Sequence, residues 1–284
     1  MLTRRDTLLA TGALCLTGLA PVEPDLTAIR ATLRGGRLGV AALDTATGRR
    51  LELDAHARYA HCSVFKLPLV AAVLARVDRG RLALTQPVRF TDADLPPNAP
   101  TVRAHLAEGA LPVAALCEAA ITLSDNAAAN LLLPLVGGPA GLTRAVRGWG
   151  DAVAQFDRNE PGLNTNLPGD PRDTTTPAAM LRLVVALTTG TVLSAASRAL
   201  LIGWLEGCRT GGKRLRAGFP AAWRAGDKTG TGEHGAANDV AVAWPMPGRR
   251  PIIVASLVDA PAVDDAARDA AHAAIGRAVA AWIG

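Results

Sequence analysis

Hydrophobic and polar positions divide the chain into strand-like segments near both ends and a helical middle. Residues 37–55 combine an apolar run and an alternating run around a Thr-Gly turn signal, which predicts a β-hairpin. Residues 264–283 carry the Ala-rich stripe of a helix that packs on a sheet. Just before this helix, three runs predict successive strands, at 223–231, 236–244 and 250–259.

The middle of the chain predicts helices interrupted by one long loop. From Ser63 to about Asp78, apolar residues fall on most sides of the helix, so this helix should be buried. Residues 155–177 show no sustained period and contain four prolines, which predicts an irregular loop of the kind that is usually functional. Because strand-like ends enclose these helices, we expect an α+β fold whose N- and C-terminal strands share one sheet. Further helices are expected within 112–149, divided at Gly137-Gly138-Pro139, and at 177–189 and 194–207, with a loop at 92–101.

The composition is that of a folded globular protein and argues against nucleic acid as a partner. Hydrophobic residues make up 49% of the 284 residues and aromatic residues only 4%, too few for a surface that stacks bases. The 30 lysines and arginines are scattered among 25 acids, so the formal charge of +5 indicates a solvated surface. The histidines and cysteines show no metal-ligand spacing, so neither a metal nor another cofactor is expected.

The N-terminus has the layout of an export signal. Within residues 3–20, Arg4 and Arg5 precede an apolar stretch that ends in a small residue, which resembles the twin-arginine type. The stretch is too short to span a bilayer, and cleavage is expected near Ala20, with a lipid anchor on Cys15 as the lesser alternative. We therefore expect a periplasmic or secreted protein with no stable membrane insertion after cleavage. Buried free thiols are expected at the remaining cysteines, Cys62, Cys117 and Cys208.

Lys66 is one of only three lysines in a chain whose other cations are arginines, and it follows Ser63 by three residues. Arginine cannot lose its proton near neutral pH, whereas a desolvated lysine can. On a helix the two residues share a face, so a neutral Lys66 could take the proton of Ser63 and create a nucleophile. Taken alone, the pair is equally compatible with an N-cap serine followed by a solvated lysine.

Two further motifs favour the chemical interpretation. Ser124-Asp125-Asn126 stands just before an apolar helix, and Lys228-Thr229-Gly230 stands in the first of the C-terminal strands. Each has an ordinary alternative, as an N-cap sequence or as a strand-to-turn signal. Their occurrence in this order after Ser-x-x-Lys is typical of class A β-lactamases and penicillin-binding proteins, and it argues against coincidence.

The long loop 155–177 adds a fourth signature. It contains Arg158-Asn159-Glu160-Pro161-Gly162-Leu163-Asn164 and then Asp170-Pro171-Arg172-Asp173, and it closely resembles the Ω-loop of class A β-lactamases. The resemblance extends over about residues 37–284 and implies a β-lactamase/transpeptidase-like fold, in which an antiparallel sheet with flanking helices joins an all-helical lobe. The implied division is a signal peptide at 1–20, an α/β lobe at about 21–60 and 205–284, and a helical lobe at about 61–204.

The resemblance also implies a reaction. Ser63 attacks the carbonyl of a small-molecule β-lactam, and either Lys66 or a water held by Glu160 acts as the base in this step. Ser124 delivers a proton to the leaving nitrogen, and Glu160 activates the water that hydrolyses the acyl-enzyme. Lys228 lowers the cost of anionic intermediates. The expected enzyme is a monomer that hydrolyses penicillins and cephalosporins and confers antibiotic resistance.

Further residues are implied to bind the substrate or to hold the loop. The backbone N–H groups of Ser63 and Thr231 form the oxyanion hole, and Asn126 contacts the acylamide side chain of the substrate. The implied substrate-binding set is Asn126, Asn164, Arg214, Thr229, Gly230 and Thr231, with Asn164 positioning the water. The implied loop-fixing residues are Arg158, Asp173 and Asn130.

Three positions depart from the common pattern of this family. Many members have an arginine on the strand after Lys-Thr-Gly, but the strand at 236–244 has none, and Arg214 matches a version that supplies the guanidinium from before the strand. The alternative for Arg214 is an ordinary surface arginine. Asn98 takes a rim position often filled by tyrosine or tryptophan. Cys62 matches one half of a disulfide found in some members, but Gly232 replaces the other half, so no bridge is expected.

Two other functions use the same three motifs. A D,D-peptidase or transpeptidase would not need the Glu160 and Asn164 pair and usually carries a membrane anchor. A β-lactam sensor would stay acylated and would need a transmembrane signalling helix. The loop residues and the lack of an anchor favour the hydrolase. Other serine hydrolases are disfavoured because no Gly-x-Ser-x-Gly occurs, and the single tyrosine, Tyr59, excludes the class with a Tyr-x-Asn motif. The scattered histidines exclude a metallo-β-lactamase.

Overall fold

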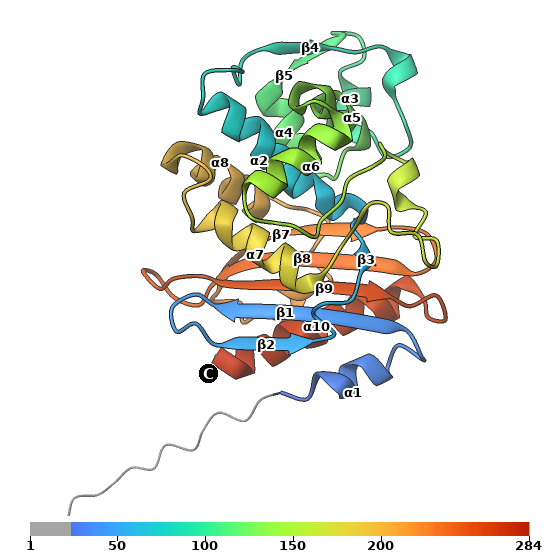
Figure 1. Cartoon of the computed structure of the whole chain (residues 1–284), viewed down its shortest axis with the longest axis vertical. Helices are drawn as coiled ribbons and strands as arrows, with labels where there is room; N and C mark the ends of the chain where they lie inside the picture. Colours follow the sequence, from blue (N-terminus) through green and yellow to red (C-terminus); the bar gives the residue numbers. More distant parts are fainter. Residues whose placement is uncertain (1–23, 284) are drawn as a thin grey trace, which may run out of the picture.

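The two ends of the chain meet in one five-stranded antiparallel sheet, in the order β2-β1-β9-β8-β7 (Figure 1). The computed structural model describes residues 24–283, so the expected signal peptide lies outside the described residues. Strand β1 pairs with β9 along its whole length, from Arg37 opposite Asp259 to Asp44 opposite Ile252. The strands are β1 (Arg37–Asp44), β2 (Arg50–Leu53), β7 (Arg224–Thr231), β8 (Ala236–Trp244) and β9 (Ile252–Asp259). The predicted α+β fold with a shared sheet is confirmed.

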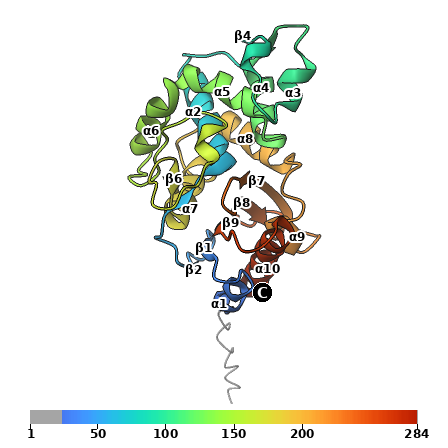
Figure 2. The same cartoon turned by 90° about the vertical axis from the view of Figure 1, so that its right-hand side faces the viewer.

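Helices cover both faces of this sheet, which explains why β8 and β9 are almost continuously apolar and buried. Helix α10 (Asp265–Ile283) lies on one face and α7 (Pro177–Thr188) on the other, as Figures 1 and 2 show. Alternate side chains of β1 divide between the two cores: Val40 packs with Trp282 on the α10 side, and Ala41 packs on the side of α7. Two short helices, α1 (Leu26–Ala31) and α9 (Leu215–Gly218), contact α10.

The helical part of the chain surrounds α2 (Lys66–Val77), whose residues from Lys66 to Ala75 are all buried. Its neighbours are α4 (Val113–Thr122), α5 (Asn126–Leu132), α6 (Gly138–Gly148) and α8 (Ala195–Glu206). These helices agree with the predicted ones, including the division near Gly137, whose φ of 90° ends one segment before the next begins. Short elements complete the fold: β3 (Tyr59–Ala60) paired with β6 (Thr174–Thr175), β4 (Pro87–Arg89) paired with β5 (Ala110–Pro112), and α3 (Pro100–Ala104).

Two local predictions need correction. The helix expected to start at Ser63 starts as an α-helix only at Lys66, because residues Cys62–Phe65 form a tighter 3₁₀ turn. The loop expected at 92–101 contains a 3₁₀ turn at Asp92–Asp94, closed by a capping box with Thr91. By contrast, 155–177 is irregular as predicted, apart from a 3₁₀ turn at Gly162–Asn164 and the short strand β6. Among residues 24–283, no helix is both long enough and apolar enough to cross a membrane.

Candidate active site

The 3₁₀ turn and the first residue of α2 place Ser63 and Lys66 side by side. Lys66 Nζ lies 2.8 Å from Ser63 Oγ, and Ser63 is only 9% exposed. The N-cap interpretation is wrong, because neither the turn nor α2 has a side-chain cap and Lys66 is completely buried. The pair therefore has the contact and the desolvation that proton transfer between them would need.

Oxygen atoms from three other residues, in two segments, surround Lys66 Nζ. They are Ser124 O at 2.8 Å, Ser124 Oγ at 3.3 Å, Asn126 Oδ1 at 2.5 Å and Glu160 Oε1 at 2.9 Å. Together with Ser63 Oγ, five oxygens therefore compete for the three protons of one ammonium group. Burial lowers the pKa of Lys66, and the negative charge of Glu160 opposes this shift. The lysine can thus lose its proton more easily than an exposed lysine.

A strained turn before α5 aims the second motif into the site. Ser124 has a φ of 56°, and the next residue, Asp125, is the N-cap that accepts from Ala128 N at 2.9 Å. The second carboxylate oxygen of Asp125 accepts from the backbone of Thr101 and Val102, which ties the turn to α3. The N-cap alternative named for this motif is therefore confirmed for Asp125, although its role in positioning the turn was not predicted.

Strand β7 brings the second buried lysine to the same serine. Lys228 Nζ lies 3.0 Å from Ser124 Oγ and 2.7 Å from Thr229 O. Burial, and then the positive charge of Lys66, lower the pKa of Lys228 to about 7. Ser124 Oγ therefore lies between two lysine nitrogens, each of which can exchange a proton with it.

The glycine of Lys-Thr-Gly is needed for close approach of the backbone. A Cβ on Gly230 would lie 2.9 Å from His61 O and 3.1 Å from Ser63 N. Strand β7 thus runs directly against the turn that carries the nucleophile. Thr231, the next residue, is exposed, while Thr229 is buried and its hydroxyl lies 2.5 Å from the hydroxyl of Thr210.

Arg214 is largely committed to bonds within the protein. Its Nη1 donates to Gly230 O at 2.9 Å and to Asn238 O at 2.8 Å. Its Nη2 donates to Thr231 Oγ1 at 2.8 Å, and its Nε forms an ion pair with Asp269 at 2.7 Å. Since a guanidinium has five N–H donors, one remains for another partner. Arg214 is not an ordinary surface arginine, because it is buried and holds the end of β7.

The long loop brings Glu160 and Asn164 to the nucleophile. Glu160 Oε1 accepts from Ser63 Oγ at 3.1 Å, and Glu160 Oε2 accepts from Asn164 Nδ2 at 2.5 Å. Asn130 on α5 holds Glu160 from behind, since its amide donates to Glu160 O at 2.9 Å and accepts from Glu160 N at 3.0 Å. The Glu160–Pro161 peptide bond is cis. Arg158 Nε and Asp173 Oδ2 meet at 2.6 Å where the two ends of the loop come together.

Asn126 and Asn98 border the site on the side of α3. Asn126 Nδ2 donates to Pro97 O at 2.8 Å, and Asn98 Nδ2 donates to Ser124 O at 3.0 Å. The segment that precedes α3 thus holds the amide of Asn126, and the turn before α5 holds the amide of Asn98. A cavity of about 430 Å³ lies beside this segment and is lined by Asn130, Asn159, Glu160, Leu131 and residues 93–96.

Sequence reasoning missed two buried polar residues behind the nucleophile. Asn238 donates to Ala60 O at 2.8 Å and to His61 O at 3.1 Å, which joins β8 to the segment leading into Ser63. The available signal was the polar pair Asn238-Asp239 inside a strand that is otherwise apolar. His61 is completely buried with its ring stacked on Phe156 at 4.5 Å between centroids, and burial lowers the pKa of His61 to about 3.

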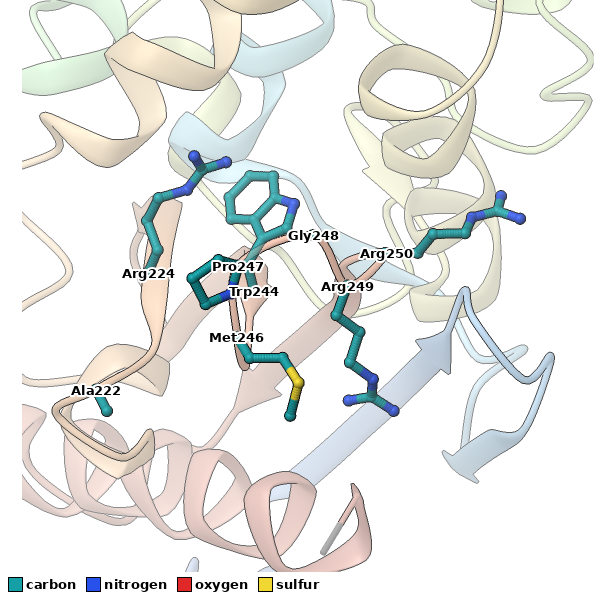
Figure 3. Close-up of a pocket in the computed structure, with 8 residues that line it drawn as sticks. All are labelled: Ala222, Arg224, Trp244, Met246, Pro247, Gly248, Arg249 and Arg250. Atoms are coloured by element: carbon teal, nitrogen blue, oxygen red, sulfur yellow. The ribbon is translucent and has the colours of Figure 1, made fainter.

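A second cavity of about 430 Å³ contains none of the predicted site residues. It lies at the start of β7 and around the turn between β8 and β9, where Arg224 stacks on Trp244 at 4.0 Å (Figure 3). The candidate site is therefore the cluster around Ser63, which gathers residues from α2, α5, β7 and the long loop.

Comparison with known proteins decides the family. The model of the Beta-lactamase enzyme family matches residues 21–283. A solved structure, the last common ancestor of Gram-negative bacteria beta-lactamase class A, is 53% identical and covers 91% of this chain and 99% of its own, with a TM-score of 0.88. The chain belongs to the class A β-lactamases.

Curated relatives of this class A β-lactamase agree with the assignment. The carbapenem-hydrolyzing beta-lactamase KPC of Klebsiella oxytoca is 46% identical over 244 residues, which are 86% of this chain and 83% of the relative. The beta-lactamase AST-1 of Nocardia asteroides is 46% identical over 226 residues, which are 80% of this chain and 72% of the relative.

Among residues 24–283 of this class A β-lactamase, the cysteines Cys62, Cys117 and Cys208 are free and buried, as expected. Cys62 packs against the end of β7, because a Cβ on Gly232 would lie 2.6 Å from Cys62 Sγ. Burial raises the pKa of the Cys62 thiol to about 12, so this thiol is a packing group and not a nucleophile.

Proposed function

We propose that this class A β-lactamase hydrolyses penicillins and cephalosporins through an acyl-enzyme on Ser63. β-Lactam hydrolysis, with the resistance that follows from it, is the activity of the family to which the chain belongs. The residue assignment rests on two contacts of Ser63 Oγ, with Lys66 Nζ at 2.8 Å and with Glu160 Oε1 at 3.1 Å. A serine flanked by two buried proton acceptors can act as an activated nucleophile.

In the proposed acylation step, Ser63 Oγ forms a bond to the lactam carbonyl carbon while its proton passes to Lys66 or, through a water, to Glu160. The backbone N–H groups of Ser63 and Thr231 would stabilise the oxyanion. As the ring C–N bond breaks, the nitrogen takes a proton from Ser124, which can be reprotonated from Lys66 or Lys228. The contacts of Ser124 Oγ with both lysine nitrogens support this route.

Substrate recognition is assigned to the rim of the same cluster. We assign the substrate carboxylate to Lys228, Thr229 and Thr231, on the strand whose backbone faces the nucleophile through Gly230. Arg214 would assist in two ways, through its one free N–H and by holding the Thr231 hydroxyl. Asn126 would contact the acylamide side chain of the substrate.

In the proposed deacylation step, Glu160 takes a proton from a water that attacks the ester carbonyl. The bond from Ser63 Oγ to the carbonyl carbon breaks, the proton returns to Oγ, and the penicilloic acid leaves. Glu160 and Asn164 are linked at 2.5 Å, so carboxylate and amide would hold one water between them and the ester. This pair favours a hydrolase over a transpeptidase, which does not need it, and over a sensor, which would stay acylated.

Intact-mass analysis with benzylpenicillin tests the assignment. We expect the parent to turn over and return to its free mass. Glu160→Ala should accumulate a covalent adduct, because acylation would then be faster than deacylation. Glu108→Ala removes an exposed glutamate and should behave as the parent. Ser63→Ala should form no adduct. A parent that stays acylated for hours would contradict the proposal and favour a sensor or transpeptidase.

The cellular setting is part of the same proposal. The class A assignment and the Arg4-Arg5 pair support export to the periplasm or medium by a twin-arginine-type signal, followed by action as a monomer. We propose that the mature protein consists of an α/β lobe at about 21–60 and 205–284 and a helical lobe at about 61–204. The intact mass of the protein recovered from the periplasm tests cleavage near Ala20.

A further inference from the structure

A second concave site lies between the C-terminal end of α2 and helix α6. It is a cavity of about 350 Å³, and its lining contains arginines but no acidic residue. Helix α2 has 12 residues, so this end is about 18 Å from the end that carries Lys66. The four arginines of the lining, here called the arginine cavity, are Arg76, Arg79, Arg81 and Arg144.

None of these four guanidinium groups has an acidic partner among residues 24–283. Two of them make one backbone contact each: Arg76 Nη2 with Val136 O at 3.3 Å, and Arg79 Nη1 with Ala75 O at 3.2 Å. Since each guanidinium has five N–H donors, most donors are free for a ligand.

The acids closest in sequence make their hydrogen bonds to other groups, although the charge of Arg79 helps to lower the pKa of Asp78. Asp78, between two of these arginines, accepts from Ser194 N at 2.8 Å, Ser194 Oγ at 2.7 Å and Ser197 Oγ at 2.6 Å. Asp151, which follows α6, caps the backbone of Val153 and Ala154. These carboxylates offset at most part of the charge of the arginine cavity.

The arginines of the cavity come from two parts of the chain: Arg76 lies on α2 and Arg79 and Arg81 follow its end, whereas Arg144 lies on α6. Arg76 reaches the Val136 carbonyl from α2. From α6, Arg144 Nη2 lies 3.6 Å from where a Cβ on Gly137 would be, directly after Val136 in the chain. The negative end of the α2 helix dipole explains a positive side chain at Arg76, in the last turn of that helix. It does not explain the position of Arg144, which lies on α6.

The cavity in Figure 3 provides a contrast within the same molecule. It is also lined by arginines, yet two of them have acidic partners: Arg224 with Glu206 at 3.0 Å and Arg249 with Asp44 at 2.8 Å. Among the described residues the protein therefore pairs two of the three arginines of that cavity, all but Arg250, and none of the four at the arginine cavity.

We propose that the arginine cavity binds a small molecule that carries at least two linked phosphate groups. Arginine forks match phosphate oxygens with pairs of parallel hydrogen bonds, and four like charges around one cavity favour a ligand with several negative charges. The volume suits a small ligand, at the low end of the range for binding pockets. The half-buried Trp149 in the wall adds an apolar surface beside the charges.

Calorimetric titration of the mature protein with inorganic pyrophosphate tests this site. We expect one binding event that weakens as salt rises, and at least about tenfold weaker binding in Arg79→Gln/Arg144→Gln, because two charge-assisted contacts are lost. The matched control is Arg182→Gln/Arg250→Gln, which removes the same charge from exposed positions elsewhere. The control should bind within about twofold of the parent, and all three proteins should keep the penicillin turnover of the parent, which shows that they are folded.

Several outcomes would overturn the inference. One is the absence of pyrophosphate binding by a parent that turns over penicillin, and another is equal weakening in both double variants, which would indicate attraction by net charge alone. Equal affinity for orthophosphate and pyrophosphate would contradict the requirement for two linked phosphates. Binding to phosphatidylglycerol vesicles without binding to pyrophosphate would indicate a membrane surface as the partner instead.

Discussion

Replacing Arg158 with methionine removes the guanidinium that joins the two ends of the Ω-loop, residues 155–177. Its Nε donates to Asp173 Oδ2 at 2.6 Å, and its Nη1 donates to Thr165 Oγ1 at 3.0 Å. Methionine keeps much of the apolar length of arginine but has no donor. The substitution therefore tests the ion pair with little change in packing.

The size of the effect follows from the burial of Asp173, whose side chain is 3% exposed, whereas that of Arg158 is 22% exposed. Removing one partner of a buried ion pair costs about 3–5 kcal/mol because the other charge is left uncompensated. Asp173 Oδ1 keeps its bonds from the backbone N–H groups of Asp157 and Arg158, so we expect the low end, about 3 kcal/mol. For a domain of this size that corresponds to roughly 6–12 °C in Tm.

The same substitution should slow deacylation, because Glu160 and Asn164 lie on the loop that the pair holds. A displacement near 1 Å at a reacting group can cost about a hundredfold in rate, so we expect acyl-enzyme hydrolysis to slow by roughly ten- to a hundredfold. Acylation should change less, since Ser63 lies in the 3₁₀ turn Cys62–Phe65 and Lys66 on α2, both outside the loop. The measurements are urea unfolding and single-turnover kinetics with benzylpenicillin followed by intact mass.

Arg172→Met is the matched control within the same loop. Arg172 binds Asp170 through Nε at 3.0 Å and Nη2 at 2.8 Å, but its side chain is 51% exposed. Solvent screens such a pair, so we expect little change in either stability or deacylation. The reasoning is refuted if Arg158→Met unfolds within about 1 kcal/mol of the parent and deacylates normally, or if the control loses as much.

Two further expectations concern the strand that carries Lys-Thr-Gly. The pKa of Lys228 is lowered to about 7, so its charge is lost above this pH, and kcat/KM for a penicillin should fall as pH rises through 7. Lys228→Arg keeps the charge and should make the fall in kcat/KM with pH shallower. A parent whose kcat/KM stays level up to pH 9 would contradict the assignment. Gly232→Ala places a Cβ 2.6 Å from Cys62 Sγ and 2.7 Å from Asn164 O, so thermal unfolding should show that the free energy of unfolding falls by about 1–3 kcal/mol. The double variant Gly232→Ala/Cys62→Ala should recover part of this stability. An unchanged stability in Gly232→Ala would contradict the prediction.

The sequence by itself determined the elements and the reacting groups. Helical periodicity, strand-like runs and turn signals are local properties, so the hairpin at 37–55, the three C-terminal strands and the irregular loop at 155–177 were all predicted close to their observed limits. The spacing of Ser63 and Lys66 is likewise local, because one helical turn suffices to bring them together.

Tertiary structure decided the environment of those groups. Ser63 and Glu160 are 97 residues apart in the chain, and Ser124 and Lys228 are 104 apart, so only long-range packing determines that their atoms meet within 3.1 Å. That packing removes water from Lys66 and Lys228 and lowers the pKa of both, whereas in the sequence alone Lys66 could equally have been a solvated side chain.

The same reason explains the features that sequence reasoning did not find. Arg76 and Arg144 belong to helices far apart in the chain, and the cavity they share exists only because α2 packs on α6. Asn238 reaches Ala60 across 178 residues of sequence. Periodicity indicates which face of a helix or strand is buried, but the charge or hydrogen bond that a side chain meets there depends on which segments the fold brings together.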